Sequence, residues 1–133
     1  MGTNYYLETN VCPHCGRCNE KLHIGKSAAG WCFCLHVLNE PDHGRTAESL
    51  EDWKLLFSAP DSQIVDEYGG IVTPREMLDV ICQRSGRKKR YSHEFLEENG
   101  AMAGPNNLLR QQPGTFCVCH GSGTWDLCVG EYS

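Results

Sequence analysis

The stretch Leu22-His-Ile-Gly-Lys-Ser-Ala-Ala-Gly-Trp-Cys-Phe-Cys-Leu-His-Val-Leu38 decides the predicted fold, because two β-prone runs flank a turn that contains glycine. Side chains alternate between the two faces of a strand. In the second run this alternation puts Trp31, Phe33, Leu35 and Val37 on one face and Cys32, Cys34 and His36 on the other. The stretch therefore predicts a β-hairpin with an apolar face and a face of cysteines and histidines.

A metal-binding pattern precedes this hairpin. The run Cys12-Pro-His-Cys15-Gly-Arg-Cys18 places two thiols at C-x2-C spacing on a turn, so one loop can hold a zinc ion by two sulfurs. Tetrahedral zinc needs two more ligands. His23 and His36 are the first choice, because they share the polar face of the hairpin, where opposed side chains lie within about 5 Å. The predicted structural zinc site is Cys12, Cys15, His23 and His36.

Several neighbouring residues compete for these roles. Cys18, Cys32 and Cys34 share the same side of the predicted hairpin and are rival ligands. His36 is alternatively a half-buried strand histidine that is bonded to the backbone. Cys34 is alternatively a small packed thiol.

The nine cysteines are expected to be reduced. The chain shows no secretory signal, and disulfides are rare in a reducing cytosol. Cys117, Cys119 and Cys128 form a further group near the carboxyl end. Packing in a terminal hairpin explains this group better than a second zinc ion does, so one structural zinc is expected.

The rest of the chain predicts short helices and strands. Ser49 with Asp52, and Thr73 with Pro74 and Glu76, have the pattern of helix N-termini. We expect a third short helix over 92–99, a second hairpin over 63–72, a loop over 39–47 and a terminal strand pair over 115–129. The prediction is one α+β domain over residues 1–133, in which the remainder packs against a zinc-pinned hairpin module of about residues 4–38.

Charge is unevenly distributed along the chain. The net charge is −5, and five of the twelve basic residues lie between positions 84 and 90. The rest of the chain therefore carries seven bases against seventeen acids, a balance of −10. This is not the basic face of a sequence-reading DNA-binding domain. The basic segment, residues 84–90, offers contacts to nucleic acid or to an acidic partner through Arg84, Arg87, Lys88, Lys89 and Arg90; a solvated linker at a helix C-terminus is the alternative.

Composition and motifs exclude some classes of protein. The hydrophobic fraction of 40% and the charged fraction of 22% are those of an ordinary globular domain. No run of about 18 apolar residues occurs, so we expect a cytoplasmic protein that does not enter membranes. The sequence shows no nucleophile, general base and orienting residue at a spacing typical of a catalytic set, so we expect that the protein is not an enzyme. A zinc hydrolase or nuclease would need an open metal position beside a carboxylate such as Glu20 or Asp42.

Several motifs resemble small proteins of bacteriophages and prophages. They are the run 4–7, the Cys12 to Cys18 knuckle, residues 22–27 and 30–37, and Thr124-Trp-Asp-Leu-Cys-Val-Gly-Glu131, which together span most of the chain. The resemblance implies that Cys12, Cys15, His23 and His36 bind zinc. It also implies that Cys18, Cys34, Cys117 and Cys119 are particular to this chain. No activity carries over from that group.

These observations lead to ordered functional hypotheses. The first is a structural-zinc accessory protein of phage type that binds a host or phage protein through its acidic body, in the host cytoplasm. The second is a nucleic-acid-binding module that uses the basic segment. A zinc-dependent hydrolase or nuclease comes last.

Overall fold

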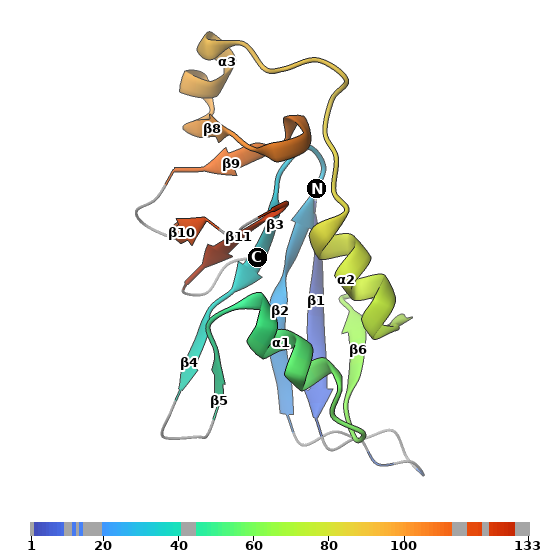
Figure 1. Cartoon of the computed structure of the whole chain (residues 1–133). Coiled ribbons are helices and arrows are strands. Elements are labelled where there is room, and N and C mark those ends of the chain that lie inside the picture. The colour runs from blue at the N-terminus through green and yellow to red at the C-terminus, as the bar shows by residue number, and fades with distance from the viewer. Residues whose placement is uncertain are drawn as a thin grey trace.

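A seven-stranded sheet forms the centre of the molecule (Figure 1). This computed structural model describes residues 2–9, 12, 14, 20–40, 45–112, 117–120 and 123–129. The strand order is β10-β11-β3-β2-β1-β6-β7, and only β3 and β11 pair in parallel. The strands are β1 (Gly2–Thr9), β2 (Glu20–Ala28), β3 (Phe33–His36), β6 (Gln63–Asp66), β7 (Ile71–Val72), β10 (Cys117–His120) and β11 (Trp125–Cys128).

The predicted hairpin is confirmed as the pair β2 and β3. The two strands are antiparallel, with Gly25 opposite Leu35, and Gly30 turns the chain with a φ of 81°. Phe33 and Leu35 are fully buried on one face, whereas Cys34 and His36 are half-buried on the other. Trp31 was expected beside Phe33, but its backbone bridges to the strand at Leu109 and its side chain stays outside the core.

Two helices cover the apolar face of the sheet. Helix α1 (Leu50–Phe57) and helix α2 (Pro74–Cys82) begin at the predicted caps, where the side-chain oxygens of Ser49 and Thr73 accept backbone N–H groups. Both helices lie on the same side of the sheet in Figure 1. The core that they close contains Leu7, Leu22, Ile24, Phe33, Leu35, Trp53, Phe57, Ile64, Met77 and Ile81.

A small layer packs at one end of the sheet. Helix α3 (His93–Glu98) begins at the cap Ser92 and is followed by β8 (Ala101–Ala103), the 3₁₀ turn η2 (Pro105–Asn107) and β9 (Leu109–Gln111). Strands β8 and β9 pair with each other, and the backbone N–H of Cys32 donates to the carbonyl of Leu109. This contact joins the small layer to the loop that precedes β3.

The sequence prediction missed two pairs of short strands. Residues 39–47 were expected to be a loop, but β4 (Leu38–Glu40) pairs with β5 (Arg45–Ala47). Strands β8 and β9 were likewise not predicted. Each of these strands has three residues, too few for an alternating pattern to stand out.

The predicted α+β class is confirmed, including the strand pair near the carboxyl end. Strands β10 and β11 form this pair, and β11 enters the main sheet beside β3. The described helices are all too short or too polar to cross a bilayer.

Candidate functional site

His23 and His36 are adjacent on the face of the sheet that α1 and α2 leave open. The ring centroids lie 5.5 Å apart. His23 Nε2 donates to Asn4 Oδ1 at 2.9 Å, and His36 Nδ1 donates to the carbonyl of His23 at 3.1 Å. Zinc-bound histidines use one ring nitrogen for such a bond while the other binds the metal. His23 is also hydrogen-bonded to the backbone of Gly25, and the role of the pair as zinc ligands stays a prediction.

The environment of His23 keeps its imidazole neutral. Burial, and then the charge of His36, lower the pKa of His23 from 6.5 to about 4. The ring of Tyr6 stacks on the His23 ring at 5.2 Å between centroids. The His23 imidazole is therefore neutral at pH 7.

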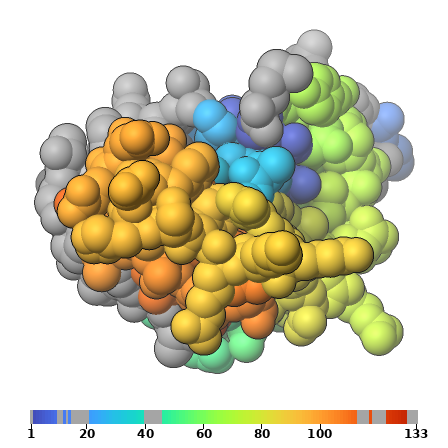
Figure 2. All heavy atoms as spheres, turned by 90° about the horizontal axis from the view of Figure 1, so that it is seen from above, coloured from blue at the N-terminus to red at the C-terminus, as the bar shows by residue number. Residues whose placement is uncertain are grey.

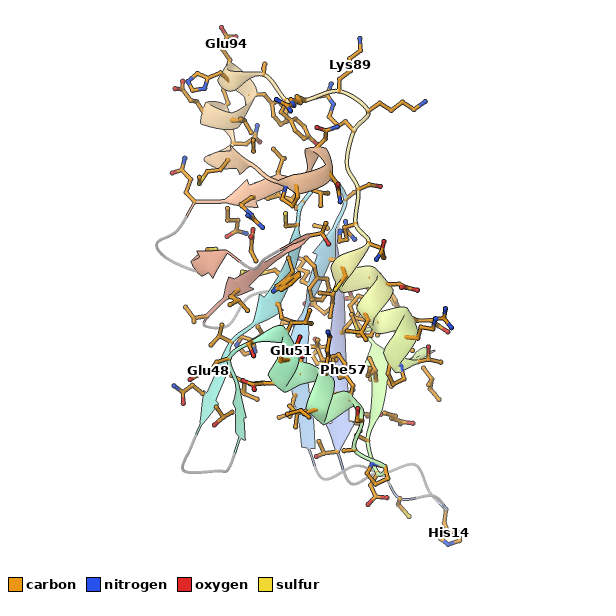
Figure 3. The ribbon with its side chains drawn as sticks, viewed as in Figure 1. His14, Glu48, Glu51, Phe57, Lys89 and Glu94 are labelled. Carbon is orange, nitrogen blue, oxygen red and sulfur yellow. A yellow bond between two sulfur atoms is a disulfide. The ribbon has the colours of Figure 1, made fainter. Side chains whose placement is uncertain are left out.

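The predicted knuckle falls only in part within the described residues. Cys12 is half-buried, and His14 is exposed at the end of the molecule far from Glu94 and Lys89 (Figure 3). Cys15 and Cys18 lie outside the described residues, and so do the side chains of Glu20, Cys119 and His120 and the whole of Asp42. Within the described part of the chain, no three His, Cys, Asp or Glu side chains are placed to hold one metal ion.

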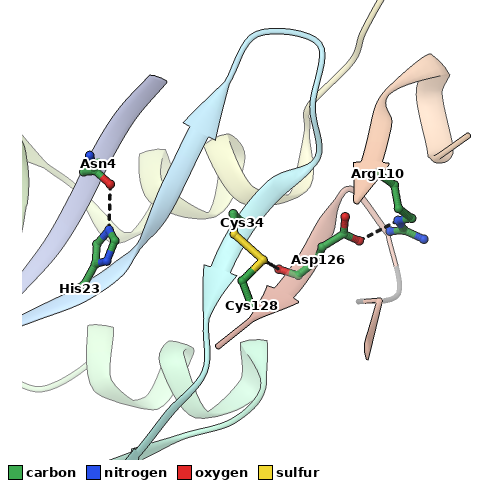
Figure 4. Close-up of a disulfide and its surroundings, with 6 residues drawn as sticks. All are labelled: Asn4, His23, Cys34, Arg110, Asp126 and Cys128. Carbon is green, nitrogen blue, oxygen red and sulfur yellow. Dashed lines mark hydrogen bonds and ion pairs between the residues drawn. A yellow bond between two sulfur atoms is a disulfide. The ribbon is translucent and has the colours of Figure 1, made fainter. Parts of the chain in front are cut away.

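Cys34 and Cys128 form a disulfide between β3 and β11 (Figure 4). Their Cα atoms are 5.9 Å apart, although 94 residues separate them in sequence. The expectation that all cysteines are reduced is therefore wrong for this pair. The parallel pairing of β3 with β11 brings the two cysteines together. No local sequence pattern predicts this pairing, because the two strands are far apart in the chain.

A buried ion pair lies beside the disulfide (Figure 4). Arg110 Nε is 2.7 Å from Asp126 Oδ1, and the side chains are 14% and 4% exposed. The thiol of Cys32 packs nearby, and burial, followed by the charge of Asp126, raises its pKa to about 11. Cys32 is thus a protonated, unreactive thiol at neutral pH.

The basic segment is anchored to the small layer by two asparagines. Asn106 and Asn107 both have positive φ angles, 53° and 58°. Their side-chain amides donate to the carbonyls of Arg84 and Arg87 at 3.2 and 3.0 Å. Gly86 approaches the carbonyl of Asn107 so closely that a Cβ atom would collide with it. The path of the basic segment is therefore defined by specific contacts.

The five basic residues divide into one structural and four exposed side chains. Arg84 is half-buried, and its guanidinium donates to the carbonyls of Trp31 and Ala28. Arg87, Lys88, Lys89 and Arg90 are exposed. Figure 2 looks onto this end of the molecule, where the yellow segment after α2 lies beside the orange atoms of α3 and the strand after it. Four positive charges therefore lie next to one another on this surface.

Aromatic rings follow the exposed bases directly. The Arg87 guanidinium lies 4.8 Å from the centroid of the Tyr91 ring, and the Tyr91 and Phe95 rings stack at 5.0 Å. The cation and the two rings hold one another in fixed orientations. A planar guanidinium fixed in this way can itself stack on a nucleobase.

An open pocket of about 610 Å³ lies between the basic segment and η2. Its size is within the range of ligand pockets, about 300–1,000 Å³. It combines apolar side chains with hydrogen-bonding groups and one cation: the lining residues are Arg90, Tyr91, His93, Leu96, Ala103, Gly104, Pro105, Asn106, Asn107 and Leu108.

Helix α3 places one acidic side chain next to the lining of the pocket. His93 Nε2 pairs with Glu97 at 3.0 Å. Glu94 and Lys89 are on opposite sides of this end of the molecule (Figure 3). Lys89 therefore lies away from Glu94, whereas Glu97 pairs with a residue that lines the pocket.

No protein-family model, curated protein or solved structure matches the chain significantly. The sequence indicated the basic segment, but it did not indicate the pocket. The pocket is built from residues 90–96 and 103–108, which meet only because α3 folds back onto β8. The sequence feature that could have indicated the pocket was the occurrence of Tyr91 and Phe95 after the basic segment, together with Asn106 and Asn107.

Proposed function

We propose that the protein binds single-stranded nucleic acid at the pocket beside the basic segment. The observation that carries the proposal is the position of four exposed cations next to a pocket of nucleotide size. Phosphates are attracted by Arg87, Lys88, Lys89 and Arg90. The pocket supplies a place for one unstacked base, which apolar contact and hydrogen bonds from asparagine and histidine would hold.

The charge distribution favours a single strand over a duplex. The acidic body would repel the long phosphate backbone of a duplex, whereas a flexible strand can follow the short basic segment. A base can enter the pocket only when it is unstacked, as it is in a single strand or a loop. We therefore expect weak duplex binding and tighter binding of single strands.

Fluorescence anisotropy with a labelled oligonucleotide tests this proposal. The variant Lys88→Gln with Lys89→Gln removes two exposed charges from the segment. Its matched control, Lys54→Gln with Arg75→Gln, removes two charges from α1 and α2. We expect at least a tenfold loss of affinity in the first variant and less than a twofold change in the control, at low salt. Equal losses would show non-specific attraction, and absence of binding by the unchanged protein would refute the proposal.

A protein partner is the second candidate, favoured by one edge of the sheet. Strand β7 is the last strand of the seven; Ile71 in this strand is 72% exposed, and Tyr68 in the turn before it is 80% exposed. Exposed edge strands and apolar side chains are common features of protein-binding surfaces. Loss of a co-purifying host protein in Ile71→Lys, but not in Leu55→Lys on α1, would support this function.

We also propose a structural zinc site, a phage origin and a location in the host cytoplasm. Support for zinc comes from the adjacency of His23 and His36. The host cytoplasm is the proposed compartment, and the phage origin rests on the sequence resemblance alone. Zinc content of the purified protein, with Cys12→Ser and His23→Gln as variants, tests the predicted ligand set.

A further inference from the structure

Three cysteines occupy three neighbouring strands on one face of the main sheet. Leu35 and Leu127 pack on the core, so Cys34 and Cys128, their neighbours along β3 and β11, lie on the opposite face. Cys117 of β10 is the antiparallel register partner of Cys128 and therefore shares its face. Because the strand order is β10-β11-β3, Cys128 lies between the other two cysteines.

We propose that Cys117 is the exchange partner of the Cys34–Cys128 disulfide, and that the exchange turns Cys34 into a site of covalent modification. In thiol–disulfide exchange a thiolate attacks one sulfur of the disulfide and the other sulfur leaves. The attacking sulfur approaches from the side opposite the leaving sulfur. Strands β10 and β3 flank β11 on opposite sides, so Cys117 is placed to attack Cys128 while Cys34 leaves.

Both pairs of cysteines satisfy the backbone geometry of a disulfide. The Cα atoms of Cys34 and Cys128 are 5.9 Å apart. Register partners in an antiparallel ladder, such as Cys117 and Cys128, have Cα atoms about 4.5 or 5.5 Å apart. Disulfides form across Cα separations of about 4.4–6.8 Å. The second disulfide therefore requires rotation of side chains but no movement of a strand.

The exchange is balanced without an oxidant or a reductant. Cys117 gives its proton to solvent, and its thiolate bonds to Cys128 as the bond between Cys128 and Cys34 breaks. Cys34 leaves as a thiolate and takes up a proton. One disulfide and one thiol are present before and after the step. Cys117 and Cys128 are 0% and 1% exposed, which keeps external thiols away from both and makes the attack internal.

The exchange changes both the accessible thiol and the strands that the disulfide joins. Cys34 is half-buried, so the thiol that the exchange releases is one that a soluble reagent can reach. Cys34 and Cys128 are 94 residues apart, whereas Cys117 and Cys128 belong to one antiparallel strand pair. After the exchange no covalent bond joins β11 to β3, and only their parallel pairing holds them together.

Trapping of the Cys34 thiol tests the inference. The oxidised protein is incubated with iodoacetamide and no added thiol for several hours, because uncatalysed disulfide rearrangement takes minutes to hours. It is then digested with trypsin without reduction. Trypsin releases residues 27–45, which contain Cys34, and residues 111–133, which contain Cys117 and Cys128. We expect the first peptide to be alkylated at Cys34 and the second to carry an internal Cys117–Cys128 disulfide.

The variant Cys117→Ser removes the attacking thiol. Alkylation of Cys34 should become at least tenfold slower, because Cys34 stays bonded to Cys128. The matched controls Cys32→Ser and Cys82→Ser each remove a thiol outside the row of three and should keep the rate of the unchanged protein. Equal rates in Cys117→Ser and the unchanged protein would overturn the inference. So would an unchanged protein in which the two peptides stay linked throughout.

A second variant, Cys34→Ser, keeps the inference testable if Cys117→Ser does not fold. It replaces a half-buried thiol by a hydroxyl and keeps both cysteines of the second disulfide. Mild oxidation should join Cys117 to Cys128, and fragmentation of the peptide 111–133 in the mass spectrometer locates the bond. A peptide that stays reduced, or one whose disulfide includes Cys119 instead, would contradict the assignment of Cys117.

Discussion

The ion pair between Arg110 and Asp126 should stabilise the attachment of the small layer to the main sheet. Arg110 belongs to β9 and Asp126 to β11, and the pair is nearly closed to solvent. Arg110 Nη2 also donates to the carbonyls of Gly123 and Trp125, at 3.1 and 3.2 Å. The variant Arg110→Met removes the cation and these bonds while keeping an unbranched apolar stem in place.

The expected cost follows from the burial of Asp126. Its side chain is 4% exposed, so loss of Arg110 leaves a carboxylate with little access to water. Breaking a buried ion pair in this way lowers the free energy of unfolding by about 3–5 kcal/mol. Replacing both charges, as in Arg110→Met with Asp126→Leu, should restore most of this loss because no buried charge remains.

Urea denaturation of the single and double variants measures both effects, provided that the m-value stays constant. The control is Lys54→Met, which breaks an exposed pair with Glu51 and should cost less than about 1 kcal/mol. A cost below about 1 kcal/mol for Arg110→Met, or a double variant no more stable than the single one, would refute the reasoning. Either result would mean that Asp126 is solvated or protonated in the folded protein.

Three further predictions concern the main sheet. Gly25→Ala should destabilise the protein by about 3 kcal/mol or more in urea denaturation, because the added Cβ would meet the carbonyl of Cys34 and the Phe33 ring; a loss below about 1 kcal/mol would contradict this packing. For His23, the unfolded chain binds a proton below pH 6.5 whereas the fold resists it down to about pH 4. Stability of the metal-free protein should therefore be complete above about pH 6.5 and fall by about 1–2 kcal/mol towards pH 4, allowing for partial exposure; an unchanged pH profile in His23→Gln would exclude this cause. Reduction of the Cys34–Cys128 disulfide should lower the free energy of unfolding by about 2–5 kcal/mol, the upper end being the value that loop closure gives for residues 94 apart; calorimetry with and without a phosphine reductant measures it, and equal melting temperatures would contradict it.

Features that depend on local sequence were predicted well. The caps at Ser49, Thr73 and Ser92 each use a side chain and a backbone N–H three residues on, so a few residues suffice to define a helix start. The alternation around Phe33 and Leu35 likewise gave the two faces of the hairpin, because burial of one face requires that pattern. The adjacency of His23 and His36 followed from the same hairpin.

Features that depend on distant contacts were not predicted. The parallel pairing of β11 with β3 joins strands about 90 residues apart, and the Cys34–Cys128 disulfide depends on it. The pocket also needs the return of α3 onto β8, and no spacing in the sequence encodes that return. In each case the feature depends on contacts between two short segments, and neither segment has a hydrophobic pattern that predicts its partner.

The salt dependence of binding to a single-stranded oligonucleotide tests the central claim most directly. Each phosphate contact contributes about −0.7 to the slope of log K against log salt concentration for single strands. Four exposed bases therefore predict a slope of about −3, and Lys88→Gln with Lys89→Gln should reduce its size by about 1.4. The same slope in the variant as in the unchanged protein, or no binding at low salt, would contradict the assignment of this surface to nucleic acid.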